Sequence, residues 1–203
     1  MNHVENLITR YPQLKECAPT IEKIVEEMVS AYQKGGKILL CGNGGSAADC
    51  EHISGELLKG FLSKRKIGEN EYPTLSPELK NSLQKAIPAI PLASLSALYT
   101  AFCNDVAPEL TFAQLVFAFG KKEDVFIGIS TSGNAKNVAA AAETARALGL
   151  KTIALTGAKE SKLSALCELT VQVPETETYK IQELHLPVYH AICAEVEQRV
   201  FEN

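Results

Sequence analysis

A glycine-rich turn and a pair of ionisable side chains are the first residues of this sequence that could do chemistry. The turn, residues 42–46, follows the apolar run 37–40, and the residues after it have a helical pattern without a breaker until Gly55. A strand that passes through a glycine turn into a helix leaves backbone N–H groups free to hold an anion. His52 and Glu56 are four residues apart, so they share one face of that helix. An anion cradle with an acid/base pair behind it suggests chemistry on a small phosphorylated molecule.

A second turn, residues 130–134, has a similar composition. It follows the buried apolar strand 124–129 and offers the hydroxyls of Ser130, Thr131 and Ser132 at the start of another helix, where they suit phosphate oxygens. Strand-to-helix turns also favour glycine and serine for turn geometry and helix capping alone. In a parallel sheet both turns would lie at the carboxyl ends of strands, where open α/β sheets bind ligands. Together they favour a phosphorylated ligand.

A nucleotide is the alternative anion. Residues 42–47 half-resemble the dinucleotide fingerprint, but that fingerprint also needs an acidic residue about 20 positions further on, at the end of a second strand. Here that region is residues 61–65, which has no acid and no strand pattern, and the sequence has no Walker A motif. We therefore predict no nucleotide cofactor.

The elements that must position these turns alternate along the chain. The predicted strands are residues 37–41, 87–93, 124–129, 152–156 and 169–173. The predicted helices are residues 1–35, the segment after the glycine turn, and residues 77–85, 94–103, 108–119, 138–148, 162–167 and 179–201. Alternation of this kind predicts the α/β class, with right-handed crossovers and a parallel sheet of about five strands between two layers of helices.

The 203 residues predict a single domain. It would begin with an N-terminal helical segment, residues 1–35, and would carry a loop or insert, residues 62–92, near the site. The last predicted helix contains His185 and His190, and Pro187 between them should kink that helix or start a new one. From the residues alone, His185 is better explained as a buried, hydrogen-bonded histidine than as a ligand.

Composition narrows the partners and the compartment. A net charge of −4 without a long basic block argues against nucleic acid as the main partner. Six cysteines without CxxC spacing fit a reducing cytosol, and no signal-peptide pattern begins the sequence, so we expect a cytoplasmic protein. The apolar stretch 86–103 contains Pro88 and Pro91, which argues against a membrane span.

The sequence resembles the SIS (sugar isomerase) domain, which has a flavodoxin-like three-layer α-β-α fold. The resemblance covers nearly the whole chain in order, and its motifs are residues 42–46, His52 with Glu56, residues 130–134 and residues 182–190. The most similar branch is that of the phosphoheptose isomerases, which interconvert sedoheptulose 7-phosphate and D-glycero-D-manno-heptose 7-phosphate. The resemblance implies an aldose–ketose isomerase with Glu56 as the base and His190 as its partner. Ten residues would bind the substrate: Asn43, Gly44, Gly45, Ser46, Asn104, Asp105, Ser130, Thr131, Ser132 and Gln182.

The resemblance also implies a metal and an assembly. Some family members bind zinc, one ion per subunit, through positions that match His52, Glu56, Gln182 and His190. The family is usually a homotetramer with sites at subunit boundaries. Isomerisation through an enediol needs a base and an acid, for which a glutamate and a histidine are suitable.

The alternative within the same family is a non-catalytic SIS protein, which binds a phosphosugar or a replication initiator. The relative that binds a replication initiator lacks the acid/base pair, so Glu56 and His190 favour an enzyme. This sequence departs from the family at Ala135, where a phosphate-binding serine is common, and in a longer stretch between residues 61 and 104, which could cover the site.

Overall fold

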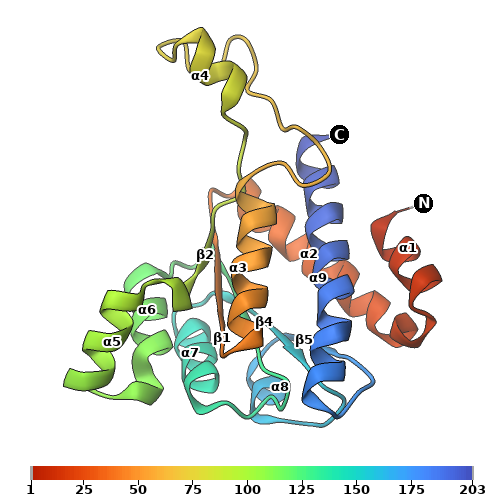
Figure 1. Cartoon of the computed structure of the whole chain (residues 1–203), viewed down its shortest axis with the longest axis vertical. Coiled ribbons are helices and arrows are strands. Elements are labelled where there is room, and N and C mark those ends of the chain that lie inside the picture. Colours follow the sequence, from red (N-terminus) through yellow and green to blue (C-terminus); the bar gives the residue numbers. More distant parts are fainter. Residues whose placement is uncertain (1, 203) are drawn as a thin grey trace.

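The computed structural model describes residues 2–202, which contain one sheet of five parallel strands (Figure 1). The strands are β1 (Ile38–Gly42), β2 (Ala89–Pro91), β3 (Val125–Ile129), β4 (Lys151–Thr156) and β5 (Leu169–Gln172). Their order across the sheet is β2-β1-β3-β4-β5. The chain therefore moves from β1 to one side for β2 and then to the other side for β3. This change of direction puts a topological switch point between β1 and β3, where open α/β sheets bind ligands.

Two layers of helices cover the sheet, which confirms the predicted three-layer α/β architecture. One layer contains α1 (His3–Arg10), α2 (Ala18–Gln33), α3 (Gly45–Leu58) and α9 (Thr178–Phe201). The other contains α6 (Thr111–Phe119), α7 (Lys136–Ala147) and α8 (Lys162–Leu166). Alternate residues of β1 divide between the layers: Ile38 and Leu40 pack toward the first, and Leu39 and Cys41 toward the second. Burial of both faces explains why the central strands are continuous apolar runs.

The N-terminal segment is helical but divided. A 3₁₀ helix, η1 (Pro12–Cys17), separates α1 from α2. Pro12 accounts for the division, because proline has no N–H to continue a preceding helix and is tolerated at the start of the next one. Helix α2 ends two residues before the predicted end of the segment, and Gly35 follows its C-cap with φ at 76°, a conformation that favours glycine.

The segment between α3 and β2 projects from the body of the protein, and we call residues 62–85 the arm. It carries α4 (Pro77–Ser82), which Figure 1 shows at the end of the molecule far from α7 and α8. The two sides of the arm meet at an antiparallel bridge between Lys66 and Gln84. No residue of α4 is buried. The prediction of a helix over residues 77–85 is right at its start and three residues too long at its end, because Leu83 is extended.

The remaining elements are short. After β2 come η2 (Leu92–Ser94), α5 (Ser96–Asp105) and η3 (Pro108–Leu110). Strand β2 is much shorter than the predicted 87–93, because Pro88 before it and Pro91 at its end cannot donate ladder hydrogen bonds, which confines it to the sheet edge. None of the helices in the described part of the chain is long and apolar enough to cross a membrane.

Helix α9 corrects one prediction. It runs through Pro187 as a single helix of 24 residues, so no new helix starts at this proline. Pro187 packs in the interior together with His185, Val188 and Tyr189, which holds the helix together despite the missing hydrogen bond. Gln182 and His190 therefore belong to one helix, about 12 Å apart along its axis.

Candidate active site

The glycine-rich turn leads directly into α3, and its backbone conformation and close contacts require glycine. Gly44, with φ at 56°, is the N-cap of α3, and no side chain caps this helix. A Cβ on Gly42 would lie 2.7 Å from the carbonyl oxygen of Ser46, so the turn closes only around glycine. Gln182 of α9 lies against the start of α3, since a Cβ on Gly45 would be 2.5 Å from its Nε2 atom. The structure thus brings Gln182 to the predicted anion cradle.

The second turn leads into α7 and also leaves a helix start open. Ala135 is the N-cap of α7 and supplies no capping side chain. Asn134 shapes the turn by donating its backbone N–H to Ser132 Oγ at 3.2 Å and its side-chain N–H to the Ser132 carbonyl at 2.9 Å. Ser130 is buried at the end of β3. Two helix starts whose N-cap residues supply no capping side chain, at one switch point, are suited to binding an anion.

One pair of side chains joins the two turns. Asn43 and Asn137 exchange two hydrogen bonds, each 2.9 Å long, so the first turn is tied to the beginning of α7. Asn137 was not predicted as a site residue, and nothing in the sequence beyond its place after the second turn could have identified it. These two hydrogen bonds hold the first turn at a fixed distance from the start of α7.

The predicted base and its partner meet on the surface between α3 and α9. His52 Nε2 lies 3.3 Å from Glu56 Oε1 and 3.4 Å from His190 Nε2. Lys59 Nζ also contacts Glu56, at 2.9 Å. Gly45, His52 and Glu56 repeat at steps of seven and four residues, so one stripe of α3 carries both the cradle and the acid/base group. Along the helix axis, His52 lies about 10 Å from Gly45 and Glu56 about 16 Å from it.

Two further residues complete this cluster and were not predicted. The hydroxyl of Tyr189 donates to Asp49 Oδ1 at 3.2 Å and lies 3.0 Å from His52 Nδ1. Burial raises the pKa of Asp49, and burial followed by the nearby Asp49 carboxylate raises that of Tyr189. Asp49 could have been found, because it lies three residues before His52 on the same helix face. Tyr189 could not, since it looks like one more apolar residue of a core helix.

The environment of His190 favours the neutral imidazole. Burial lowers the pKa of His190, the neighbouring His52 and Arg10 lower it further, and Glu56 opposes them. The ring of Phe61 covers it, with centroids 5.7 Å apart. A neutral imidazole near pH 7 can accept a proton, as a general base must.

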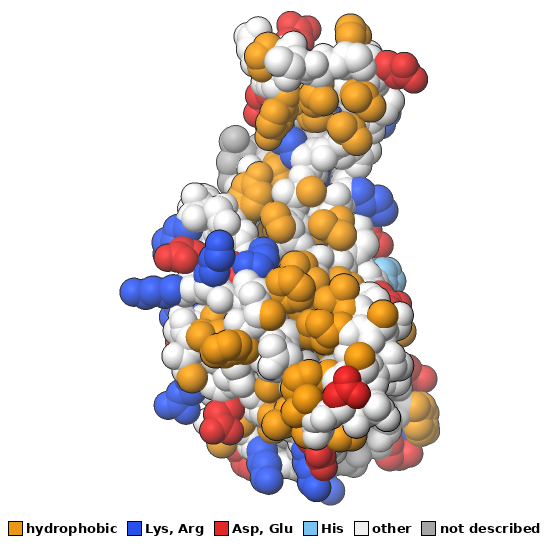
Figure 2. Space-filling view, turned by 90° about the vertical axis from the view of Figure 1, so that its left-hand side faces the viewer, with side chains coloured by type: hydrophobic (Ala, Val, Ile, Leu, Met, Phe, Trp, Pro, Cys, Tyr) orange, Lys and Arg blue, Asp and Glu red, His pale blue; other side chains and the backbone are white. Residues whose placement is uncertain are grey.

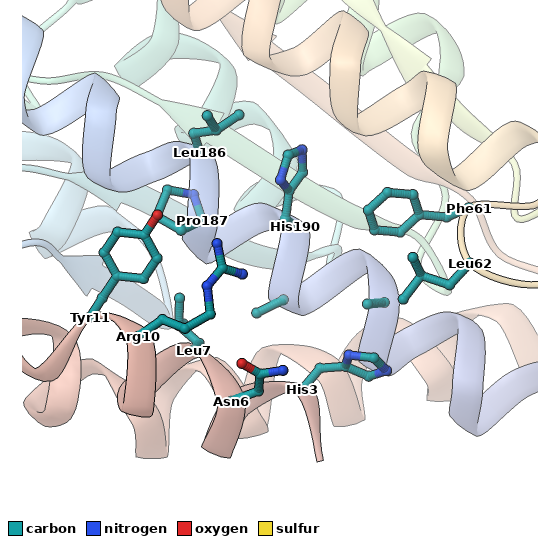
Figure 3. Close-up of a pocket in the computed structure, with 12 residues that line it drawn as sticks. His3, Asn6, Leu7, Arg10, Tyr11, Phe61, Leu62, Leu186, Pro187 and His190 are labelled. Atoms are coloured by element: carbon teal, nitrogen blue, oxygen red, sulfur yellow. The ribbon is translucent and has the colours of Figure 1, made fainter. Parts of the chain in front are cut away.

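A cavity of about 370 Å³ lies beside His190, between α1, α9 and the beginning of the arm (Figure 3). Arg10 and Asn6 of α1 point into it, and Phe61 and Leu62 form the wall at the base of the arm. Neither turn borders this cavity. The arm therefore approaches the acid/base cluster only where it joins the body of the protein, at Phe61 and Leu62.

The other predicted residues are distributed as follows. Asn104 and Asp105 are exposed at the end of α5, and their side chains hydrogen-bond to each other at 2.9 Å. His185 is fully buried with Nε2 at 3.3 Å from the Thr156 carbonyl, which agrees with a structural role. Within residues 2–202, no group of three or more His, Cys, Asp or Glu side chains is placed to hold a metal ion.

Comparisons with known proteins agree with this geometry. A sequence model of the SIS domain family matches residues 2–157. The phosphoheptose isomerase of Aneurinibacillus thermoaerophilus is 38% identical over 189 residues, 93% of this chain and 86% of that protein. That of Roseiflexus sp. is 40% identical over 186 residues, 92% of this chain and 85% of the relative. A phosphoheptose isomerase structure from Francisella tularensis superimposes with a TM-score of 0.77 at 30% identity, covering 98% of this chain and 100% of that one.

The parallel sheet, with two helix starts that no side chain caps at its switch point, defines an α/β protein with a site suited to an anionic ligand. The chain belongs to the SIS domain family and, within it, to the phosphoheptose isomerases.

Proposed function

We infer that this chain is an aldose–ketose isomerase that interconverts sedoheptulose 7-phosphate and D-glycero-D-manno-heptose 7-phosphate. One observation carries the inference: Glu56 and His190, far apart in the sequence, meet at His52 in a chain whose relatives are phosphoheptose isomerases. This acid/base pair favours an enzyme over the non-catalytic alternative.

We propose that the reaction passes through an enediol. Glu56 removes a proton from C1 of the ketose while a proton reaches the C2 oxygen, which gives the enediol. The O1 proton then leaves and a proton is delivered to C2, so that C1 becomes the aldehyde carbon. His190 handles the oxygen protons. Each of the two groups is expected to contribute roughly 10²–10⁴-fold, as is typical of general acid–base catalysis.

The phosphate is proposed to bind at the starts of α3 and α7. Support comes from the uncapped N–H groups there and from the hydroxyls of Ser46, Ser130, Thr131 and Ser132. His52 lies about 10 Å further along α3, seven positions from Gly45 at 1.5 Å each, and Glu56 lies about 6 Å beyond it. An open seven-carbon chain carries its phosphate and its carbonyl near opposite ends, so its carbonyl end would point along α3 toward His52 and Glu56.

We propose a homo-oligomer, with a tetramer as the expectation from the family. Figure 2 shows apolar side chains gathered on the face formed by α5 and α6, and Val106 and Phe117 are each 66% exposed. Contiguous exposed apolar surface of this kind marks an interaction site. A second copy is the natural route by which Asn104 and Asp105 would reach a substrate. A cytoplasmic location is also proposed, supported by six cysteines that are all free thiols.

Zinc at His52, Glu56, Gln182 and His190 stays a prediction. The 3.3 Å and 3.4 Å separations around His52 Nε2 resemble those of ligand atoms held about 2.0–2.1 Å from a tetrahedral zinc ion. However, Gln182 lies against Gly45, and the described residues hold no complete ligand group. The four residues do not fit zinc as they stand. Metal analysis of protein purified without chelator tests the prediction, and absence of zinc together with an unchanged rate in chelator refutes it.

The experiment for the main proposal is a screen of C5, C6 and C7 ketose phosphates for conversion to the aldose. Sedoheptulose 7-phosphate should be converted with the highest kcat/KM. Binding of phosphosugars without conversion of any of them would instead support the non-catalytic alternative.

A further inference from the structure

The cavity between α1, α9 and the beginning of the arm is lined by polar groups that the proposed reaction does not use. Its volume of about 370 Å³ lies within the range of small-molecule sites, roughly 300–1,000 Å³. One side of α1 supplies these groups, since His3, Asn6 and Arg10 follow one another at steps of three and four residues. Figure 3 shows Arg10 and Asn6 pointing into the cavity, and His190 of α9 belongs to the same lining.

The fixed charge of this cavity has one sign. Arg10 is always positive, and none of the described residues that line the cavity is acidic. Within residues 2–202, Arg10 has no ion-pair partner, and its Cζ atom lies 5.4 Å from the ring centroid of Tyr11. The chain as a whole carries a net charge of −4, so a positive cavity is not a general property of its surface. The cavity therefore favours an anion.

The remaining walls of the cavity are apolar. Phe61 and Leu62 come from the beginning of the arm, and α9 contributes Leu186, Pro187 and Ala191. Apolar walls with a few convergent polar groups are typical of sites for small organic molecules. A guanidinium and an amide donor suit the oxygens of a carboxylate or a phosphate, and the walls suit the carbon atoms attached to them.

Contacts outside the cavity hold the polar side of α1 in place. The backbone N–H of His3 donates to Oε2 of the buried Glu195 of α9 at 2.9 Å. Val4 and Leu7 anchor the helix to the core, with 3% of each exposed. A site whose walls are fixed in this way loses little conformational entropy when a ligand binds.

We propose that this cavity binds a small organic anion, a carboxylate or a phosphate monoester on a short carbon body, with Arg10 and Asn6 as donors and Phe61 and His190 against its carbon atoms. The site is separate from the phosphate site proposed at the two turns, because neither turn borders the cavity. An occupant would touch the ring of His190 and hinder the acid/base pair. The cavity is thus a place where an anion can inhibit the enzyme.

The test uses two probes, butyrate and glycerol 3-phosphate, on the full-length protein. Hydrogen exchange followed by mass spectrometry should slow in residues 3–11 when a probe is added, and the concentration that gives half of this protection measures the affinity. Because the readout is local, binding of glycerol 3-phosphate at the turns does not disturb it. Arg10→Gln removes the charge-assisted hydrogen bonds and should weaken the affinity about 10–100-fold.

Arg146→Gln is the matched control for Arg10→Gln. Arg146 is also an exposed residue in the last turn of a helix, α7, and it does not line the cavity. This variant should bind the probes as wild type does. Inorganic phosphate, which has no carbon body, should protect residues 3–11 less than the better of the two probes.

The outcomes decide both the site and its ligand class. Protection by butyrate alone would identify a carboxylate site, and protection by glycerol 3-phosphate alone would identify a phosphate monoester site. The proposal is overturned if neither probe protects residues 3–11, or if Arg10→Gln binds as tightly as wild type. Protection that rises with protein concentration and responds to neither probe would show that a second copy covers the cavity, which also overturns it.

The inhibitory role rests on the proposed function. With sedoheptulose 7-phosphate as substrate, the probe that protects residues 3–11 should slow wild type, and half-inhibition of Arg10→Gln should need about 10–100-fold more of it. Occupancy without inhibition would refute the inhibitory role and leave the site. If no ketose phosphate is converted, the proposed function fails, while hydrogen exchange still decides whether the cavity binds an anion.

Discussion

Arg65 and Glu197 form a buried ion pair where the arm joins the body of the protein. Glu197 of α9 is 1% exposed and receives the Nε–H of Arg65 at 2.6 Å. The same carboxylate accepts the backbone N–H groups of Phe61, Leu62 and Ser63 at 2.7, 2.7 and 3.1 Å. Burial alone would raise the pKa of Glu197, but these donors outweigh it and hold the pKa below its ordinary value.

Replacing Glu197 with alanine would leave a guanidinium in the interior without a countercharge. The other Arg65 nitrogens donate to the carbonyls of Leu57 and Glu56 at the end of α3, at 2.6 and 2.9 Å, so the side chain cannot easily turn out to water. Breaking a buried pair in this way costs about 3–5 kcal/mol. Because Phe61 packs on His190, the same change should also loosen the wall beside the catalytic imidazole.

The assay is urea unfolding at one fixed protein concentration, since association would otherwise change the apparent stability. Glu177→Ala is the matched control: it removes an exposed partner of Lys180 and should change the stability little. The double variant Arg65→Met, Glu197→Leu should be less destabilised than the sum of its single changes. The reasoning is refuted if Glu197→Ala is no more destabilising than the control.

Two further predictions concern the buried His185 and the glycine turn. Burial lowers the pKa of His185 to about 4 from 6.5, so between these values the unfolded chain binds more protons than the folded one. Stability should therefore fall by about 2 kcal/mol from pH 7 to pH 5 through this group. Urea curves for a His185→Gln variant should lack that part of the loss, and an identical pH slope would disprove the attribution. Gly45→Ala should fold, because only the flexible end of Gln182 obstructs the new methyl group, yet should weaken phosphosugar binding measured by calorimetry; unaltered affinity would show that this contact is irrelevant.

The sheet and its two turns could be predicted because their signals are local. All five strands were identified from apolar runs between breakers, and the turns from glycine and hydroxyl residues that follow a strand. Three departures lie where proline is present: β2 is shorter than predicted, the N-terminal helix is divided, and no new helix starts at Pro187 within the predicted α9. At Pro187, tertiary packing outweighs the preference of proline to end a helix.

The site itself was only partly predictable. His52 and Glu56 share a helix face and can be found by spacing, whereas His190 was identified only through a family resemblance. Arg65 and Glu197 are separated by 132 positions, and Tyr189 looks like core until its hydroxyl is seen between two polar groups. Such contacts depend on how α3 and α9 pack, which no local pattern encodes.

The central claim is that Glu56 moves a carbon-bound proton during isomerisation. The most direct measurement follows sedoheptulose 7-phosphate in D₂O by NMR, with wild-type protein and Glu56→Gln side by side. Wild type should exchange deuterium into the carbon next to the carbonyl as the aldose appears. Glu56→Gln should bind the sugar within a few-fold of wild type yet show neither exchange nor turnover. Exchange and turnover at the wild-type rate in Glu56→Gln would contradict the account.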